Sequence, residues 1–290
     1  MKKTALARKK WLEKHGTWVH FVHRDLMRRT PTMKALAPHA SHTAPVPTTV
    51  LPVDCTGNAA VTCQMLGNDQ YGDCGPVMCA HVDEIRTFGQ GQPGFIECLV
   101  DQSALVAQYE QVSGGDNGTT EDMLVGSGGI WMTGLAGDTT AVVCDHMDFD
   151  VTNTSLAQYF IDQFYAVNVA WSVPDEFLNE FALGASFLSP MTPDPENGHF
   201  TPLADVDASG NYRLWTWGAW CWVSPSFMAS VDPESFVTFS ALQFNKNTGY
   251  DSHGRHVCDQ AAAWIAMGGD ANKVNAIVAL FPSKPTTPSV

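Results

Sequence analysis

The sequence reads GNDQYGDCGPVMCAHVDEIRTF at residues 67–88, a polar, glycine-containing loop followed by a run with helical periodicity. Apolar side chains recur at helical spacing, and they are Val77, Met78, His81, Val82, Ile85 and Phe88. Asp83, Glu84 and Arg86 are off this stripe. Proline fits only in the first turn of a helix, so Pro76 sets the start at or just before Cys74. The pattern predicts an amphipathic helix over 74–88.

A cysteine at this position has a defined chemical use. The free N–H groups and partial positive charge of a helix N-terminus favour thiolate over thiol, which makes the sulfur of Cys74 nucleophilic. The same N–H groups can stabilise an oxyanion on an attacked carbonyl, and Asn68, six residues earlier, could add a side-chain amide. The alternative is a small cysteine buried at the start of a helix.

A nucleophilic cysteine needs a base, and His199 is the histidine that the sequence favours. It follows the turn residues 196–198 and begins a predicted strand, HFTPLADV, over 199–206. A second strand, NYRLWTW, over 211–217 would pair with it across the turn at 207–210 and ends in Trp217-Gly218. The alternative for a single histidine at a strand start is an imidazole that only packs or faces solvent.

These elements together resemble papain-like cysteine peptidases. The matching segments are Asn68 to Gly75 with its Gly-Asp-Cys, the Asn197-Gly198-His199 strand start, and Trp215-Thr216-Trp217-Gly218. The set is also similar to uncharacterised bacterial and phage proteins with a papain-like core, and it spans roughly 60–245. The resemblance implies an α+β fold in which a helical half carrying the cysteine at a helix N-terminus packs on a β-rich half carrying the histidine. It implies a papain-like domain over 51–290, with a C-terminal helical extension, after an arm and linker at 1–50.

The resemblance also implies roles for the catalytic residues. Cys74 would be the nucleophile, His199 the base and Asn68 the oxyanion donor, where the family usually has glutamine; Gln70 is an alternative at the wrong spacing. The family orients its histidine with Asn or Asp, and here Thr216 is the residue that could accept a bond from the imidazole N–H. A Trp217 lid would keep the pair dry.

The hairpin register decides whether Thr216 can reach His199. If the turn pairs Val206 with Asn211, Thr201 faces Thr216 and Thr216 shares the His199 face of the sheet. A slip of one residue would put Trp215 and Trp217 on that face instead.

The remaining elements follow from periodicity and turn signals. We expect helices over 101–113, with Asp101 as N-cap, over 120–134 with a glycine interruption, over 154–164, and a terminal helix over 258–267. Strands are expected over 139–149, 165–172 and 235–243. Helices first and strands later are typical of an α+β fold.

The charge of the chain is strongly segregated. Residues 1–34 carry ten basic and two acidic residues, a net charge of about +8, whereas the other 256 residues carry six basic and 28 acidic ones, about −22. The acidic body excludes broad duplex nucleic-acid binding. The basic arm, with expected helices over 3–15 and 18–29, would dock onto an acidic partner or simply be a solvated helix, and the proline-rich stretch 31–52 is expected to be an extended linker.

Composition gives further expectations about location and ligands. The start lacks the apolar run of a signal peptide and no run is long enough to cross a membrane, so a cytoplasmic or virion-associated protein is expected. Most of the eight cysteines are then reduced thiols, with Cys55 and Cys63 the pair to test for a disulfide. No cofactor is expected. Zinc is disfavoured, because neither the Asp251–Cys258 segment nor His20 and His23 has structural-zinc spacing. Asp145, Asp148 and Asp150 could bind a cation, but a solvated turn is favoured for them.

Two function classes remain open. One is a cysteine peptidase or related amidase acting on a peptide or protein. The other is a structural or interaction protein of the same fold with weak or no turnover, such as a virion component that docks through its basic arm.

Overall fold

The computed structural model describes residues 65–88, 100–136, 143–181 and 184–285. Expectations for the basic arm, the linker, the start of the domain near residue 50 and the Cys55–Cys63 pair lie outside these residues. Within them, Cys74, Cys79, Cys144, Cys221 and Cys258 are free thiols. No helix of the described residues is long and apolar enough to cross a bilayer.

The helical half comes first along the chain. It consists of α4 (Cys74–Phe88), α5 (Gln102–Ser113), α6 (Glu121–Val125) and α7 (Ile130–Thr133). Asp101 caps α5 by accepting from the Ala104 N–H, and Thr120 caps α6 by accepting from the Met123 N–H. Gly126 ends α6 and Gly129 begins α7. These boundaries confirm the predicted helices over 74–88 and 101–113 and the interrupted helix over 120–134.

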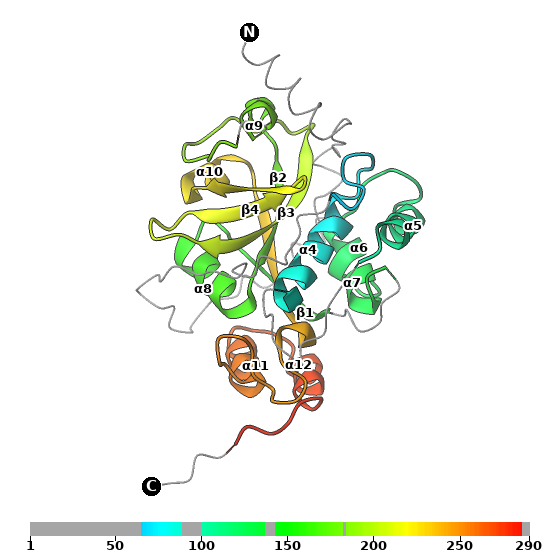
Figure 1. The fold of residues 1–290 in the computed structure, drawn as a ribbon, viewed down its shortest axis with the longest axis vertical. Helices are drawn as coiled ribbons and strands as arrows, with labels where there is room; N and C mark the ends of the chain where they lie inside the picture. Colours follow the sequence, from blue (N-terminus) through cyan, green and yellow to red (C-terminus); the bar gives the residue numbers. More distant parts are fainter. Residues whose placement is uncertain (1–64, 89–99, 137–142, 182–183, 286–290) are drawn as a thin grey trace.

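The β-rich half is a six-stranded sheet in the order β1-β6-β2-β3-β4-β5, in which every pairing is antiparallel. The strands are β1 (Val143–Phe149), β2 (Val167–Ser172), β3 (Gly198–Val206), β4 (Tyr212–Thr216), β5 (Ala219–Val223) and β6 (Glu234–Ser240). Helix α4 packs on β3, and Figure 1 shows α5, α6 and α7 beyond it, with α8 (Thr154–Phe164) on the other side of the sheet. The α+β class, with Cys74 on the helical half and His199 on the sheet, is therefore confirmed.

Helix α4 is buried on all sides, and this corrects the expectation of one apolar stripe with charged residues outside it. Asp83 and Arg86 are fully buried, and Glu84 is 3% exposed. The Arg86 guanidinium donates to the backbone oxygen and the hydroxyl of Thr238 in β6, at 2.7 and 2.8 Å, and it pairs with Asp83 at 3.7 Å. Asp83 also accepts from the Trp131 indole of α7 at 2.8 Å. A helix between a sheet and other helices has no solvent side, so its charged residues join neighbouring elements.

The hairpin of β3 and β4 has the predicted register toward the His199 end of β3, but not next to the turn. Val206 pairs with Tyr212, one residue away from the expected Asn211, whereas Leu203 pairs with Leu214 as the predicted alignment requires. A shift between these two pairs restores the alignment toward the His199 end of the strand. Thr216 therefore reaches the His199 face even though the pairing next to the turn was predicted wrongly.

Several elements were not expected from the sequence. They are β5, α9 (Asp175–Phe181), α10 (Pro225–Ser230), the short 3-10 helix η1 (Ala241–Gln243) and α12 (Ala271–Val278). The helix expected to be terminal, α11 (Val257–Ala266), is followed by α12, and Asp270 caps α12 through its side chain. Asp145 and Asp148 lie in strand β1, not in a solvated turn. Asp145 is buried and accepts from the Trp264 indole at 2.9 Å and from Lys273 at 3.2 Å.

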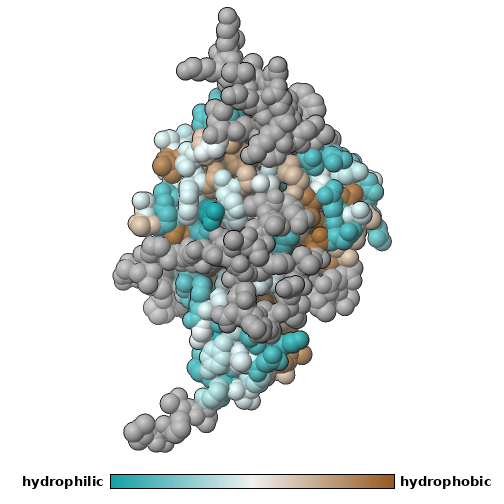
Figure 2. Space-filling view, viewed as in Figure 1, coloured by the Kyte–Doolittle hydropathy of each residue, from teal (hydrophilic) through white to brown (hydrophobic). Residues whose placement is uncertain are grey.

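The described surface is mostly hydrophilic on the face shown in Figure 2, with small separate hydrophobic areas. Among the described residues, only Leu188 and Leu280 are large hydrophobic side chains in the exposed class. The apolar residues of both halves instead form one core around α4 and the sheet.

Candidate active site

The loop before α4 is a tight turn that positions the start of the helix. Gly67 has a φ of +103°, which L side chains rarely adopt, and a Cβ there would lie 2.8 Å from Asp73 Oδ2. The Tyr71 N–H donates back to the Gly67 oxygen at 3.0 Å. The Gly72 N–H donates to Asp116 at 2.7 Å, which fixes the loop to the segment after α5. The backbone therefore delivers Cys74 in a fixed position at the first turn of α4.

Glycine is also required directly after the cysteine. A Cβ at Gly75 would overlap the hydroxyl oxygen of Thr119 and would lie 3.2 Å from a methyl of Leu124. Thr119, just before α6, and Leu124, within α6, thus pack against the backbone of α4 directly after Cys74. This close approach explains why Gly75 belongs to the motif.

Cys74 lies against the strand that carries His199. Burial raises the pKa of the Cys74 thiol to about 12, against the opposing effect of hydrogen bonding from the Phe200 backbone and from the backbone at Gly75 and Cys74 itself. The side chain is 1% exposed. The thiol is thus next to β3 at the residue after His199, and it is protonated in this closed arrangement.

His199 is held in place by Thr216, the last residue of β4, and by Trp217, which follows it. Its Nε2 is 2.6 Å from the Thr216 hydroxyl oxygen, and its ring stacks on Trp217 with centroids 4.4 Å apart and planes at 14°. Burial, with a smaller contribution from the nearby His81, lowers the pKa of His199 to about 3. The imidazole is therefore neutral, as a general base must be before it accepts a proton.

The backbone at Trp217 is strained, with a φ of +43°, and Gly218 follows with a φ of +68°. A bulky residue in the left-handed region costs free energy and persists only where its surroundings enforce it, which occurs often at functional sites. Here the strained turn places the Trp217 ring over the imidazole. Trp215, two residues before Trp217, stacks on His81 of α4 instead, with ring centroids 4.3 Å apart.

The two amides considered for the oxyanion differ in burial. Asn68 is 3% exposed in the turn before α4, and its Oδ1 has no hydrogen-bond partner among the described residues. Gln70 is exposed. Asn68 therefore lies inside the loop that leads to Cys74, whereas Gln70 faces away from the interior.

Asp73 is a site residue that the sequence did not assign. It is fully buried directly before Cys74, and neither carboxyl oxygen has a hydrogen-bond partner among the described residues. Burial raises the pKa of Asp73 to about 8, and the charges of Asp116 and Asp69 raise it as well. Its ionised form would raise the pKa of Cys74. An acidic residue at a helix start is ordinarily ionised and stabilising, and only the fold shows that this one is enclosed.

This burial predicts a pH dependence of stability. Because the folded state holds the Asp73 proton more tightly than the unfolded chain, Asp73 contributes stability that is fully present below about pH 4 and is lost between about pH 4 and 8. Each such proton contributes a slope of up to about 1.4 kcal/mol per pH unit. Glu84, with a pKa raised to about 8 by burial and by Asp83, adds a second proton.

Urea unfolding of wild type and Asp73→Asn from pH 5 to 8 measures the effect. The slope of Asp73→Asn should be more positive than that of wild type by up to about 1.4 kcal/mol per pH unit. Asp150→Asn, at an exposed position, should keep the wild-type slope. Equal slopes for wild type and Asp73→Asn would mean that Asp73 is not the buried acid described above.

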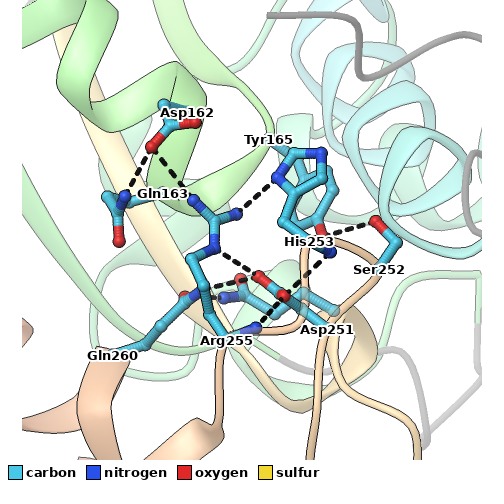
Figure 3. A network of polar contacts seen from close by, with 9 residues as sticks. Asp162, Gln163, Tyr165, Asp251, Ser252, His253, Arg255 and Gln260 are labelled. Atoms are coloured by element: carbon cyan, nitrogen blue, oxygen red, sulfur yellow. Dashed lines mark hydrogen bonds and ion pairs between the residues drawn. The ribbon is translucent and has the colours of Figure 1, made fainter.

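The polar residues around Asp251 form a loop network that serves the fold (Figure 3). Asp251 accepts from Arg255 Nε and from Gln260 Nε2, each at 2.7 Å. His253 Nδ1 lies 2.8 Å from an Arg255 nitrogen, and His256 caps α11 by accepting from the Cys258 N–H. The bonds of Asp251 and His256 therefore join this loop to the first turns of α11.

No protein-family model matches the chain, and no curated protein sequence matches it. One solved structure similar to it is xylellain, a cysteine protease from Xylella fastidiosa, at 11% identity and a TM-score of 0.44, covering 77% of this chain and 95% of that one. Another is procathepsin B S9 from Trypanosoma congolense, at 11% identity and a TM-score of 0.44, covering 79% and 88%. The likeness concerns the overall arrangement of the chain alone.

Proposed function

We propose that the protein is a cysteine peptidase or related amidase that acts by Cys-His acyl transfer on a peptide or protein. One observation carries the proposal: Thr216 of β4 bonds to Nε2 of His199, and the backbone of Phe200, the next residue of β3, hydrogen-bonds to the Cys74 thiol. A histidine fixed at one nitrogen, beside a cysteine at a helix N-terminus, is the arrangement that nucleophilic catalysis needs.

The proposed reaction uses the neutral forms of both residues. A hydrogen on Nε2 that is donated to Thr216 leaves the basic lone pair on Nδ1 of His199. That nitrogen takes the proton of Cys74 as the sulfur attacks the carbonyl carbon. The Cys74 backbone N–H and the Asn68 amide hold the oxyanion, and His199 then gives its proton to the departing amine. Water, deprotonated by His199, hydrolyses the thioester and restores the thiol.

Thr216 orients the base without giving it a charge partner. A carboxylate in this position would stabilise the imidazolium, whereas a hydroxyl fixes only the ring direction and the tautomer. The Trp217 ring, stacked on the imidazole, would exclude water from the proton-transfer path. The acidic body favours basic or neutral peptides by long-range attraction.

A second function is favoured by a separate observation. Cys74 and His199 are 1% and 0% exposed, and burial disfavours the thiolate of one and the imidazolium of the other. A protein with these properties at rest would be a structural or interaction protein of low turnover, and its basic arm at 1–34 would bind an acidic partner in a cytoplasmic or virion setting.

Labelling with a library of peptidyl acyloxymethyl ketones, in which a catalytic thiol displaces a carboxylate from the carbon next to the ketone, distinguishes the two functions. For an enzyme we expect one adduct, on Cys74 by peptide mass spectrometry, formed at pH 7 at least tenfold faster than any adduct on the half-buried Cys258. Cys74→Ala should remove this adduct and leave labelling of Cys258 unchanged. Labelling of Cys74 no faster than that of Cys258 throughout the library would establish the structural role instead.

A further inference from the structure

A group of metal-ligating side chains lies apart from the cysteine and histidine described above. Glu121 is at the first position of α6, and His146 and Asp148 are two residues apart in β1, on one face of that strand. One ligand atom from each, a carboxylate oxygen or an imidazole nitrogen, lies within 4.8 Å of the other two. The sequence could not suggest this group, because Glu121 precedes the strand pair by more than twenty residues.

The face of β1 that carries these residues is turned toward the helical half. Asp145 and Met147 alternate with them and are buried on the opposite face, where Asp145 bonds to Trp264 of α11. Thr238 pairs with His146 across the strands and so shares its face, and its hydroxyl accepts a hydrogen bond from Arg86 of α4. Helices α6 and α7 pack against β1. The ligand atoms thus converge at the junction of α6 with the edge strand of the sheet.

The three side chains are partly sheltered from bulk solvent, which favours binding of a cation. Glu121 is 6% exposed, and His146 and Asp148 are half-buried. The Phe236 ring of β6 stands edge-on to His146, with centroids 6.4 Å apart and planes at 86°, and forms an apolar wall. A divalent cation placed among these ligand atoms would be attracted by both carboxylates.

The donor set indicates the class of metal. An imidazole nitrogen beside two carboxylate oxygens favours a first-row divalent ion such as Zn²⁺ or Mn²⁺, since Ca²⁺ and Mg²⁺ prefer oxygen ligands alone. Three protein ligands leave further coordination positions for water. We propose that Glu121, His146 and Asp148 form a binding site for a divalent transition-metal ion that fastens α6 to β1.

The metal would have a structural role. In the sheet order, β1 is three strands from β3, roughly 14 Å at the usual strand spacing, so the ion is remote from His199. It nevertheless steadies the segment behind the nucleophile, because Thr119, two residues before Glu121, packs on Gly75. Metal binding is therefore expected to stabilise the folded protein without taking part in acyl transfer.

The test uses the full chain, freed of metal with a chelator and then titrated with Zn²⁺ alone. We expect one Zn²⁺ per chain by equilibrium dialysis and a melting temperature that rises with Zn²⁺ concentration. Glu121→Gln, His146→Ala and Asp148→Asn should each lower the Zn²⁺ affinity at least tenfold and reduce the rise. His253→Ala, at an exposed histidine outside the group, should leave both unchanged and so controls for adventitious binding.

Further measurements keep the result interpretable if a variant is damaged. Circular dichroism of each metal-free variant checks the fold before titration. Co²⁺ in place of Zn²⁺ should give a spectrum without a thiolate charge-transfer band, because Cys144 is not a proposed ligand. Zn²⁺ affinity that survives all three substitutions, a thiolate band, or stabilisation by Ca²⁺ but not by Zn²⁺ would overturn the proposal.

Discussion

Replacing His199 with alanine is expected to slow the acylation of Cys74 by about 10³-fold, measured as release of p-nitroaniline from peptidyl anilides. General acid–base catalysis typically contributes about 10²–10⁴-fold, and the resting thiol depends on its base because burial raises the pKa of Cys74 to about 12. Circular dichroism should show that the variant keeps the fold. A rate within about threefold of wild type would remove His199 from the mechanism.

Thr216 is expected to have a smaller effect in the same assay, since it acts through His199. Thr216→Ala removes the 2.6 Å contact with His199 Nε2 and should slow acylation by up to about 10²-fold, the scale typical of a misplaced catalytic group. Thr216→Ser keeps the hydroxyl and should recover most of the rate. Equal losses in both variants would indicate a packing defect rather than loss of orientation.

The second large effect concerns stability. Arg86→Ala is expected to lower the free energy of unfolding by about 3–5 kcal/mol, because it leaves the fully buried Asp83 without its cation and Thr238 without two hydrogen bonds. Such a loss is a large share of the about 5–15 kcal/mol by which proteins are ordinarily stable. Urea unfolding followed by tryptophan fluorescence measures it.

The ion pair of Lys284 with Asp259 is the matched control, since both side chains are about half exposed, and Lys284→Ala should cause no measurable change. A second control separates charge from packing. Arg86→Met alone leaves the buried carboxylate, whereas Arg86→Met with Asp83→Asn removes it and keeps an acceptor for Trp131, so the double variant should be the more stable. The opposite order would show that Asp83 is not the destabilising charge.

Local signals in the sequence were sufficient for the elements that carry the site. Pro76 and the apolar spacing located the start of α4 at Cys74, and the turn at 207–210 located the hairpin that begins near His199. Side-chain capping is similarly local, and Asp101 and Thr120 cap the helices predicted for them. Such features depend on residues within one or two turns of the chain.

Features that depend on distant residues were missed. The charged residues of α4 were assigned outside its apolar stripe, because periodicity does not reveal that helices and a sheet enclose the helix. The shift between Leu203 and Val206 changes the hairpin register without any glycine in that stretch to mark it. Strand β6 is inserted between β1 and β2, and no strand was predicted over the short run that forms β5.

Strand β6 is the last strand to be synthesised but lies between β1 and β2, so the sheet cannot be completed until late in synthesis. The hydrogen bonds of Arg86 reach a residue 152 positions later, and loop closure over such distances is slow. At a translation rate of about 5–20 residues per second, Thr238 leaves the ribosome roughly 8–30 seconds after Arg86. The helix that bears Cys74 is therefore synthesised well before β6, and the complete sheet can form against it only after β6 has left the ribosome. A nascent chain would expose this apolar helix to chaperones long before the sheet that carries His199 is complete.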